Sequence, residues 1–166
     1  MEFQEAKEKF IQSWGVLGTH WGINKTMAQI HALLLISPEV LSTEDIMQEL
    51  KISRGNVNMN VRALMDWGIV TKSFKTGERR EYFFADKDIW DVARKITEER
   101  TKRELLPVIA ILNEVKDIQG EDKEVKQFKK TVSDLASFTS SLNSIIKKFI
   151  KSDAHWFYKS LLKIVK

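Results

Sequence analysis

The chain contains no cysteine, only two prolines, and three histidines, His20, His31 and His155. The absence of cysteine excludes disulfide bonds, thiolate metal ligands and cysteine nucleophiles, and it is compatible with a reducing compartment. The histidines do not have the H-x-x-x-H or H-E-x-x-H spacing of zinc sites, and no phosphate-binding loop is present. We therefore expect no metal site, no cofactor and no enzymatic activity.

A long apolar run is also missing. The densest one, residues 105–112, is far shorter than the ~20 residues that a helix needs to cross a bilayer. The opening segment, MEFQEAKEKF, lacks the basic-then-apolar order of a signal peptide. We expect a soluble, cytoplasmic protein that does not bind a membrane.

The positive charge of the chain is unevenly distributed. The net charge of +4 over 166 residues is by itself a weak indication of a polyanionic partner. Residues 51–87, however, contain eight basic and four acidic side chains, whereas residues 37–50 contain four acidic side chains and no basic one. The basic excess therefore begins near residue 51, and we look there for a nucleic-acid interface.

The first helix is predicted from a stripe of apolar residues in the segment 1–18. These residues recur three and four positions apart, as on one face of an amphipathic helix. Gly15, Gly18 and Gly22 loosen the chain around Thr19, His20 and Trp21, so we expect the helix to end or bend there. A helix with such a stripe needs a surface to pack against.

A second helix is expected to start at Thr26. Gln29 stands three residues later, which is the spacing of a capping box, and an apolar run follows. Ser37 and Pro38 should end this helix, because the residue before a proline is disfavoured in the helical conformation.

A helix-turn-helix is predicted over residues 42–67. Ser42 and Asp45 have capping-box spacing at the start of a short third helix, and Ser53 caps a fourth. Ile52 lies in the turn between them and supplies it with an apolar residue. Gly68 stands where a left-handed C-terminal cap belongs.

The fourth helix has an apolar and a polar face. At about 100° per residue, Val57, Val61 and Leu64 share one side. Gly55, Met59 and Arg62 lie opposite, flanked by Asn56 and Asn58. We expect the first row to be buried and the second set to face outward.

A β-hairpin follows this helix. Residues 69–74 and 81–84 are rich in β-branched and aromatic side chains, and the segment 75–80 between them contains Gly77 and the three cations Lys75, Arg79 and Arg80. A recognition helix followed by a basic hairpin is the order of a winged helix. The order favours a DNA-binding function.

The remaining half of the chain is predicted to be amphipathic helix. Asp86 is expected to cap a helix beginning near Asp88, Pro107 to kink or split it, and Gly120 to interrupt it. A further helix should run over residues 121–151, and a last one should carry Trp156, Phe157, Leu161, Ile164 and Val165. Such stripes need a partner, and a second copy of the chain would place two recognition helices roughly 34 Å apart.

The predicted fold is mainly α: an α+β winged helix-turn-helix with long C-terminal helices forming a dimerisation arm. We divide it into residues 1–22, an N-terminal helix contributing to the dimer interface; 23–87, the DNA-binding domain; and 88–166, the helical dimerisation region.

The segments LSTEDIMQELKISRGNVNMNVRALMDWGIV and KTGERREYFFA resemble the winged-helix transcriptional regulators of the MarR superfamily, and more narrowly its GbsR-type branch. The resemblance implies a homodimer whose recognition helix enters the major groove, and a repressor that a small effector releases. Some relatives of this branch respond to choline-like osmolytes, but no residue pattern here indicates an effector site. Carried over by position, it implies these DNA contacts: Ser53, Arg54, Asn56, Asn58, Met59 and Arg62 from the helix, and Lys75, Arg79 and Arg80 from the wing.

Each contact has a competing interpretation. Arg54 and Arg62 can bind guanine edges or phosphate, and phosphate receives about half to two-thirds of protein–DNA hydrogen bonds. The asparagines suit adenine but also suit a first helical turn, and Met59 suits a thymine methyl group or a plain surface position. Gly55 would allow close approach of the backbone to DNA or a tight packing contact. Of Arg79 and Arg80, one is expected to face DNA while the other pairs with Glu78 or Glu81.

Two broader alternatives stay open. Three of the five tryptophans, Trp14, Trp21 and Trp90, would suit an aromatic cage for a quaternary amine, although core packing is the commoner use of tryptophan. The whole unit would also suit a winged-helix interaction module that docks a protein partner and does not bind DNA.

Overall fold

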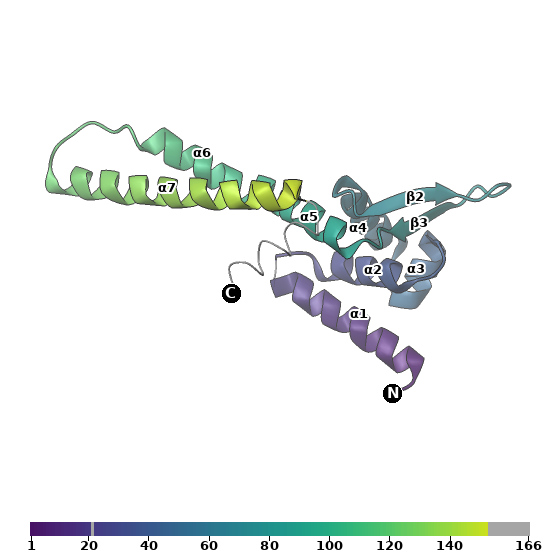
Figure 1. The fold of residues 1–166 in the computed structure, drawn as a ribbon. Coiled ribbons are helices and arrows are strands. Elements are labelled where there is room, and N and C mark those ends of the chain that lie inside the picture. Colours follow the sequence, from purple (N-terminus) through teal and green to yellow (C-terminus); the bar gives the residue numbers. More distant parts are fainter. Residues whose placement is uncertain (21, 153–166) are drawn as a thin grey trace. The chain divides into compact units, whose positions relative to one another are not determined.

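A computed structural model describes residues 1–20 and 22–152 (Figure 1). The chain forms two compact units, one spanning Met1–Val92 and the other beginning at Ala93. The last predicted helix, with Trp156 and Phe157, lies outside the described residues. We describe each unit by itself.

In the first unit, α1 (Phe3–His20) packs along α2 (Lys25–Ile36). α1 ends at His20, within the segment where we expected the helix to end or bend. Gly15 and Gly18, however, lie inside α1 and do not interrupt it. Both glycines are buried against α2. A Cβ atom added at Gly15 would stand 2.7 Å from Cγ of Gln29 on α2. The two glycines therefore allow α1 and α2 to approach closely. Only Gly22, with φ of 71°, lies beyond the helix end as expected.

The start of α2 also differs from our prediction. Asn24, and not Thr26, is the N-cap: its side-chain oxygen accepts a hydrogen bond of 2.8 Å from the backbone N–H of Thr26. The end at Ser37 is as predicted. There the Nζ of Lys87 donates to the backbone carbonyls of Leu34 and Ser37, each at 2.8 Å, and to that of Leu35. Lys87 thereby satisfies carbonyls that the helix end leaves without partners.

His31 is the buried polar side chain of α2. It is 3% exposed, and its ring lies 6.4 Å from that of Trp14. Its Nε2 atom has no hydrogen-bond partner among the described residues. Burial, with a further contribution from the charge of Lys87, lowers the pKa of His31 to about 4.

The helix-turn-helix is confirmed as α3 (Thr43–Leu50) followed by α4 (Arg54–Asp66). Ser42 Oγ accepts from the N–H of Asp45 at 3.2 Å, and Asp45 Oδ2 accepts from the N–H of Ser42 at 2.8 Å, which completes the predicted capping box. Lys51 takes the left-handed conformation in the turn, with φ of 54°. Ser53 then caps α4 by accepting from the N–H of Asn56.

The core of this unit lies between α2, α3 and α4. Ile30, Leu33 and Leu34 of α2 are at most 1% exposed. The predicted inward row of α4, Val57, Val61 and Leu64, is buried against them. Gly68, with φ of 70°, ends α4: its N–H donates to Met65 and the N–H of Ile69 donates to Leu64, a Schellman motif.

The wing is an antiparallel hairpin of β2 (Val70–Phe74) and β3 (Glu81–Ala85), which extends away from α2 and α3 in Figure 1. A third strand that we did not predict, β1 (Leu41–Ser42), pairs with β3 in the order β1-β3-β2. Leu41 stands opposite Phe83 and Ser42 opposite Tyr82. This pairing joins β3 of the wing to Ser42, the residue that caps α3.

α5 (Ile89–Arg100) starts in the first unit and continues into the second. Its N-cap is Asp88, whose carboxylate accepts from the N–H groups of Trp90 and Asp91. Asp86, which we predicted as the cap, instead accepts from the N–H of Asp88 and shapes the preceding turn.

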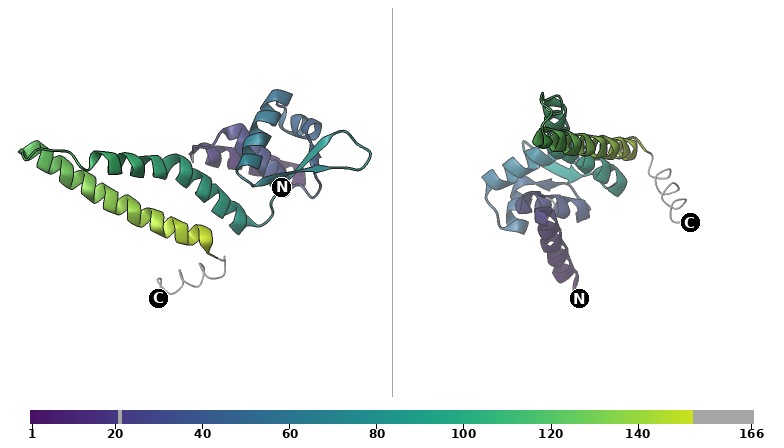
Figure 2. Two further views of the ribbon diagram at one scale, coloured as in Figure 1. Left: turned by 90° about the horizontal axis from the view of Figure 1, so that it is seen from above. Right: turned by 90° about the vertical axis from the view of Figure 1, so that its left-hand side faces the viewer.

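The second unit continues with a π-helical turn, η1 (Thr101–Leu105), then α6 (Leu106–Val115) and α7 (Lys123–Lys151). Pro107 explains the break: it lacks an N–H, and its ring clashes with the carbonyl four residues back. The N–H of Leu106 accordingly donates to Thr101, five residues back. After Gly120 the chain reverses, and α6 and α7 lie side by side as an antiparallel hairpin (Figure 2).

Helix and sheet together confirm the predicted fold class, a mainly α chain with an α+β winged helix-turn-helix. Within residues 1–20 and 22–152, none of the helices has the length and apolar character required to cross a membrane.

Candidate nucleic-acid interface

The outward face of α4 is exposed along its length. Arg54, Asn58 and Arg62 are exposed, and so is Met59, at 58%. Gly55 lies on the same face, and a Cβ atom added there would meet nothing within 4 Å. Among the described residues Gly55 makes no tight packing contact, which was its second interpretation, and the surface of α4 is open to a close partner at this point.

Asn56 and Asn60 occupy the edge and the inside of α4. Asn56 is half-buried, and Asn60, which our sequence analysis passed over, is 3% exposed. The Nδ2 atom of Asn60 donates to the backbone carbonyl of Asn56 at 2.8 Å. Helical periodicity could have predicted that Asn60 is buried, because position 60 lies three residues after Val57 and next to Val61.

Arg54 is joined to α3 by an ion pair. Its Nη2 atom lies 2.6 Å from Oε1 of Glu44, and both side chains are substantially exposed, at 58% and 42%. The hydrogen bond from Arg54 lowers the pKa of Glu44, and the charge of Arg80 lowers it further. A cation of the predicted contact set is thus held by a carboxylate of the same chain.

The wing tip, residues 75–80, carries the other cations. Lys75, Arg79 and Arg80 are exposed, and Gly77 turns the chain with φ of 82°. The Nζ atom of Lys75 lies 4.5 Å from the ring centre of Tyr82. This cation–π contact holds one cation against β3.

The two acidic residues of the wing have other partners than the arginines. The hydroxyl of Tyr82 donates to Glu78, and Lys72 pairs with Glu81. Among the described residues, neither Arg79 nor Arg80 forms an ion pair with these carboxylates, so the expected pairing of one arginine is not present. Both arginines stay available for an external anion.

The N-terminal end of α3 lies within reach of several of these cations. The hydrogen bonds from Ser42 lower the pKa of Asp45, and the positive charges of Lys75 and Arg80 lower it further. Arg80 acts on Glu44 in the same way. Arg54 thus contacts the start of α3 through Glu44, and Lys75 and Arg80 act on the same end of the helix through their charge. Arg62 and Arg79 are exposed.

The tryptophans do not form a cage within the described residues. Trp14 packs against Phe10, with ring centres 5.5 Å apart, and beside His31. Trp90 is 43% exposed, and no ring contact joins it to Trp14 within residues 1–20 and 22–152. Trp21 lies outside the described residues. In the part of the chain that the structure describes, no group of histidine, aspartate and glutamate side chains could hold a metal ion.

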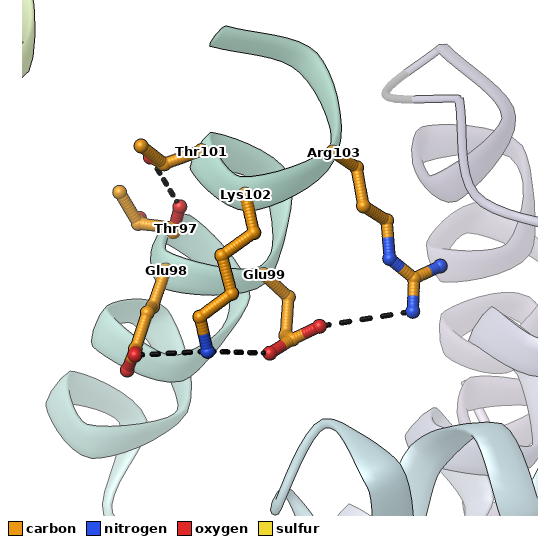
Figure 3. A network of polar contacts seen from close by, with 6 residues as sticks. All are labelled: Thr97, Glu98, Glu99, Thr101, Lys102 and Arg103. Carbon is orange, nitrogen blue, oxygen red and sulfur yellow. Dashed lines mark hydrogen bonds and ion pairs between the residues drawn. The ribbon is translucent and has the colours of Figure 1, made fainter. Parts of the chain in front are cut away.

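The second unit carries a surface ion-pair network along the end of α5 and η1 (Figure 3). Lys102 lies 3.0 Å from a carboxylate oxygen of Glu98 and of Glu99, and Arg103 lies 3.7 Å from Glu99. Thr101 Oγ1 donates to the carbonyl of Thr97 at 2.7 Å. These contacts stabilise the helix around its π turn, each by a modest amount because the groups are near solvent.

The same unit exposes apolar side chains on α6 and α7. On α7, Val132 and Thr139 are buried in the hairpin, whereas Phe138 and Ile145 are 64% and 62% exposed. Others are exposed to a lesser degree: Phe128 and Leu135 on α7, and Leu106, Val108 and Ile111 on α6. The apolar face of α7 is therefore wider than the strip of it that is buried against the rest of the chain.

A helix-turn-helix whose second helix runs directly into a basic β-hairpin defines a winged-helix protein. The chain is similar to the HTH-type transcriptional repressor GbsR of Bacillus subtilis (strain 168), with 22% identity over 117 residues, which are 70% of this chain and 64% of that protein. The chain thus spans less than two thirds of this relative. A solved structure, described as the crystal structure of a transcriptional regulator, has the same fold, with a TM-score of 0.67, 16% identity, and coverage of 87% of this chain and 95% of that one. The chain matches no family model.

Proposed function

We propose that the protein is a transcriptional regulator that binds duplex DNA in a sequence-specific manner and acts as a repressor. The observation that carries the proposal is the outward face of α4, where Arg54, Asn58, Met59 and Arg62 are exposed directly opposite a fully buried apolar row. An α-helix fits the major groove of B-DNA, where each base pair presents a distinct pattern of donors and acceptors. No enzymatic activity is part of this function.

The wing supports the same placement. Lys75, Arg79 and Arg80 extend the positive surface beyond α4, so the hairpin would contact the neighbouring minor groove or the phosphates flanking the helix. The nine residues named from the sequence remain our predicted contacts: Ser53, Arg54, Asn56, Asn58, Met59, Arg62, Lys75, Arg79 and Arg80. The similarity to a transcriptional repressor, and to the fold of a transcriptional regulator, favours this function over a protein-docking module.

We further propose that the active form is a homodimer. The wide apolar arc of α7 and the exposed residues of α6 supply the surface, and such surfaces mark interaction sites. Phe3, Val16 and Leu17 of α1 are also exposed, consistent with the predicted contribution of residues 1–22. A twofold dimer would place two α4 helices on successive turns of one face of the DNA, roughly 34 Å apart.

We also propose the finer assignment to the GbsR-type branch of the MarR superfamily, a cytoplasmic location and release from DNA by a small-molecule effector. These points rest on the resemblance of the residues quoted above, and the similarity to GbsR supports the coarser role of a transcriptional repressor. We leave the chemical identity of the effector open.

A selection from random duplexes tests the function. The full chain is incubated with a random library, bound duplexes are recovered over several rounds, and the enriched site is checked by fluorescence anisotropy. We expect a palindromic or near-palindromic site, with an affinity that falls steeply with salt because phosphate contacts release counterions. Sedimentation with and without this duplex should show two chains per site. Failure to enrich any sequence, together with salt-insensitive binding to all duplexes, would contradict the proposal and favour the interaction module.

A further inference from the structure

Glu44 is an acidic side chain in contact with a residue of the predicted DNA-contact surface. It is the second residue of α3, and its carboxylate lies 2.6 Å from the Nη2 atom of Arg54, the first residue of α4. The charge of Arg80 on the wing acts on the same carboxylate. Arg54 therefore contacts this anion of the same chain directly, and the charge of Arg80 adds to its positive surroundings.

A carboxylate and a phosphate make the same kind of contact with a guanidinium group. Both present oxygen acceptors to its N–H donors in charge-assisted hydrogen bonds. The Nη2 atom that donates to Glu44 is therefore engaged as it would be by a backbone phosphate of DNA. When DNA approaches, Arg54 has to exchange Glu44 for phosphate, and the freed carboxylate stays close to the negative backbone.

The contact has little importance for the fold. The N-terminal cap of α3 is formed by Ser42 and Asp45, without Glu44. Both partners of the pair are exposed, and exposed ion pairs stabilise proteins by about 0–1 kcal/mol. Residue 44 can thus change without loss of the helix-turn-helix.

We propose that Glu44 is an intramolecular competitor of DNA phosphate for Arg54 and restrains binding to duplexes of any sequence. This inference rests on the proposed DNA-binding function. Because every duplex presents phosphates, the restraint applies to nonspecific and operator DNA alike. Glu44 therefore sets the overall affinity, and the base contacts of α4 set the preference among sequences.

The test is the Glu44→Gln substitution in the full chain, measured by fluorescence anisotropy on a random-sequence duplex and on the selected site. We expect about two- to fivefold tighter binding to both, the range that an exposed ion pair supports. The gain should shrink as salt rises from about 50 to 300 mM, because the charges become screened. It should also shrink strongly in an Arg54→Ala background, where the competitor has lost its target.

Glu49→Gln is the matched control. Glu49 lies on the same helix, and its carboxylate pairs at 2.5 Å with Lys7 of α1, so the substitution makes the same charge change at a pair outside the interface. We expect it to change DNA affinity much less. Equal or weaker binding by Glu44→Gln, in a protein whose parent binds DNA, would overturn the competitor role and leave the proposed function standing. Absence of DNA binding by the parent chain itself would overturn the proposed function.

Discussion

A Cβ atom added to Gly18 would stand 2.5 Å from the Cβ of Ala28, a distance that no real pair of such atoms keeps. The backbones of α1 and α2 are therefore closer here than they could be if residue 18 had a Cβ atom. Ala28 is 5% exposed and its Cβ is fixed to the α2 backbone, so it cannot swing away as the end of a long side chain can.

Gly18→Ala should destabilise the first unit. Overpacking of a buried contact costs about 1–3 kcal/mol, and the gain in helix propensity, about 0.5–1 kcal/mol, recovers only part of it. We expect a lower urea midpoint with an unchanged slope. Gly55→Ala is the matched control, because a Cβ there meets open space on α4. It should leave stability unchanged or slightly higher, and a comparable loss of stability in both variants would contradict the packing argument.

Arg62→Ala should weaken DNA binding without unfolding the protein. Arg62 is exposed on α4, so its removal leaves no buried cavity. If it contacts phosphate, the slope of log K against log salt should become shallower by about 1, and if it contacts a base, the loss of about 1–3 kcal/mol should appear on the selected site alone. Lys9→Ala, which removes an exposed cation from α1, serves as the control. Unchanged affinity on all duplexes would remove Arg62 from the contact set.

Phe138→Glu should convert the dimer into a monomer. Phe138 is the most exposed of the large apolar residues of α7, and a carboxylate placed there would have to be desolvated in an apolar interface. Sedimentation velocity gives the mass, and DNA affinity should fall because two half-sites are no longer bound together. Ser140→Glu places the same charge about 200° around the helix, and we expect it to stay dimeric. A dimeric Phe138→Glu would exclude this face as the interface.

Stability should fall as the pH is lowered from about 6.5 to 4. The pKa of His31 is about 4 in the folded chain, against 6.5 as its ordinary value, so within this window the unfolded chain binds a proton that the folded chain does not. The loss should reach about 3 kcal/mol, because one pKa unit corresponds to about 1.4 kcal/mol.

His31→Phe isolates this effect. The variant keeps a ring in the same position but cannot titrate, so its stability should vary much less over this pH range. The carboxylates with lowered pKa, Glu44, Asp45 and Glu104, also destabilise the folded chain as the pH falls toward and below their ordinary pKa, but they are common to both proteins. Parallel pH profiles from chemical denaturation would show that His31 is not the source.

Features determined by neighbouring residues were predictable from the sequence. Ser42 with Asp45, and Gly68 after α4, act through contacts within a few positions, and the structure contains both as expected. The inward row of α4 follows from helical period alone. Where two candidates stood close together, the choice was harder: Asn24 was missed in favour of Thr26, and Asp88 in favour of Asp86, because either residue of each pair can accept from a first-turn N–H.

Features that depend on distant residues were not predictable. From the sequence alone, a glycine in a helix predicts a break, because the residue packed against it is not known. In the structure Gln29 lies opposite Gly15, and Ala28 lies opposite Gly18. β1 is only two residues long and forms because β3 offers an edge forty residues later. The Arg54–Glu44 pair likewise joins two helices across a turn. The contact residues themselves, the division into residues 1–22, 23–87 and 88–166, and the dimer stay predictions.

The π turn at Thr101–Leu105 has a consequence for any change in chain length near it. A turn closed by a bond to the fifth residue back contains one residue more than an α-helical turn, so it acts as a one-residue insertion in an otherwise continuous helix. Because the wider turn absorbs the extra residue, removing one residue from this segment would let the helix close with α geometry and leave α6 facing nearly the same way, whereas an α-helical segment of unchanged length would rotate the exposed side chains of α6 by about 100° relative to α5. The direction in which Leu106, Val108 and Ile111 point is thereby set by the π turn that precedes them, and not by their own sequence.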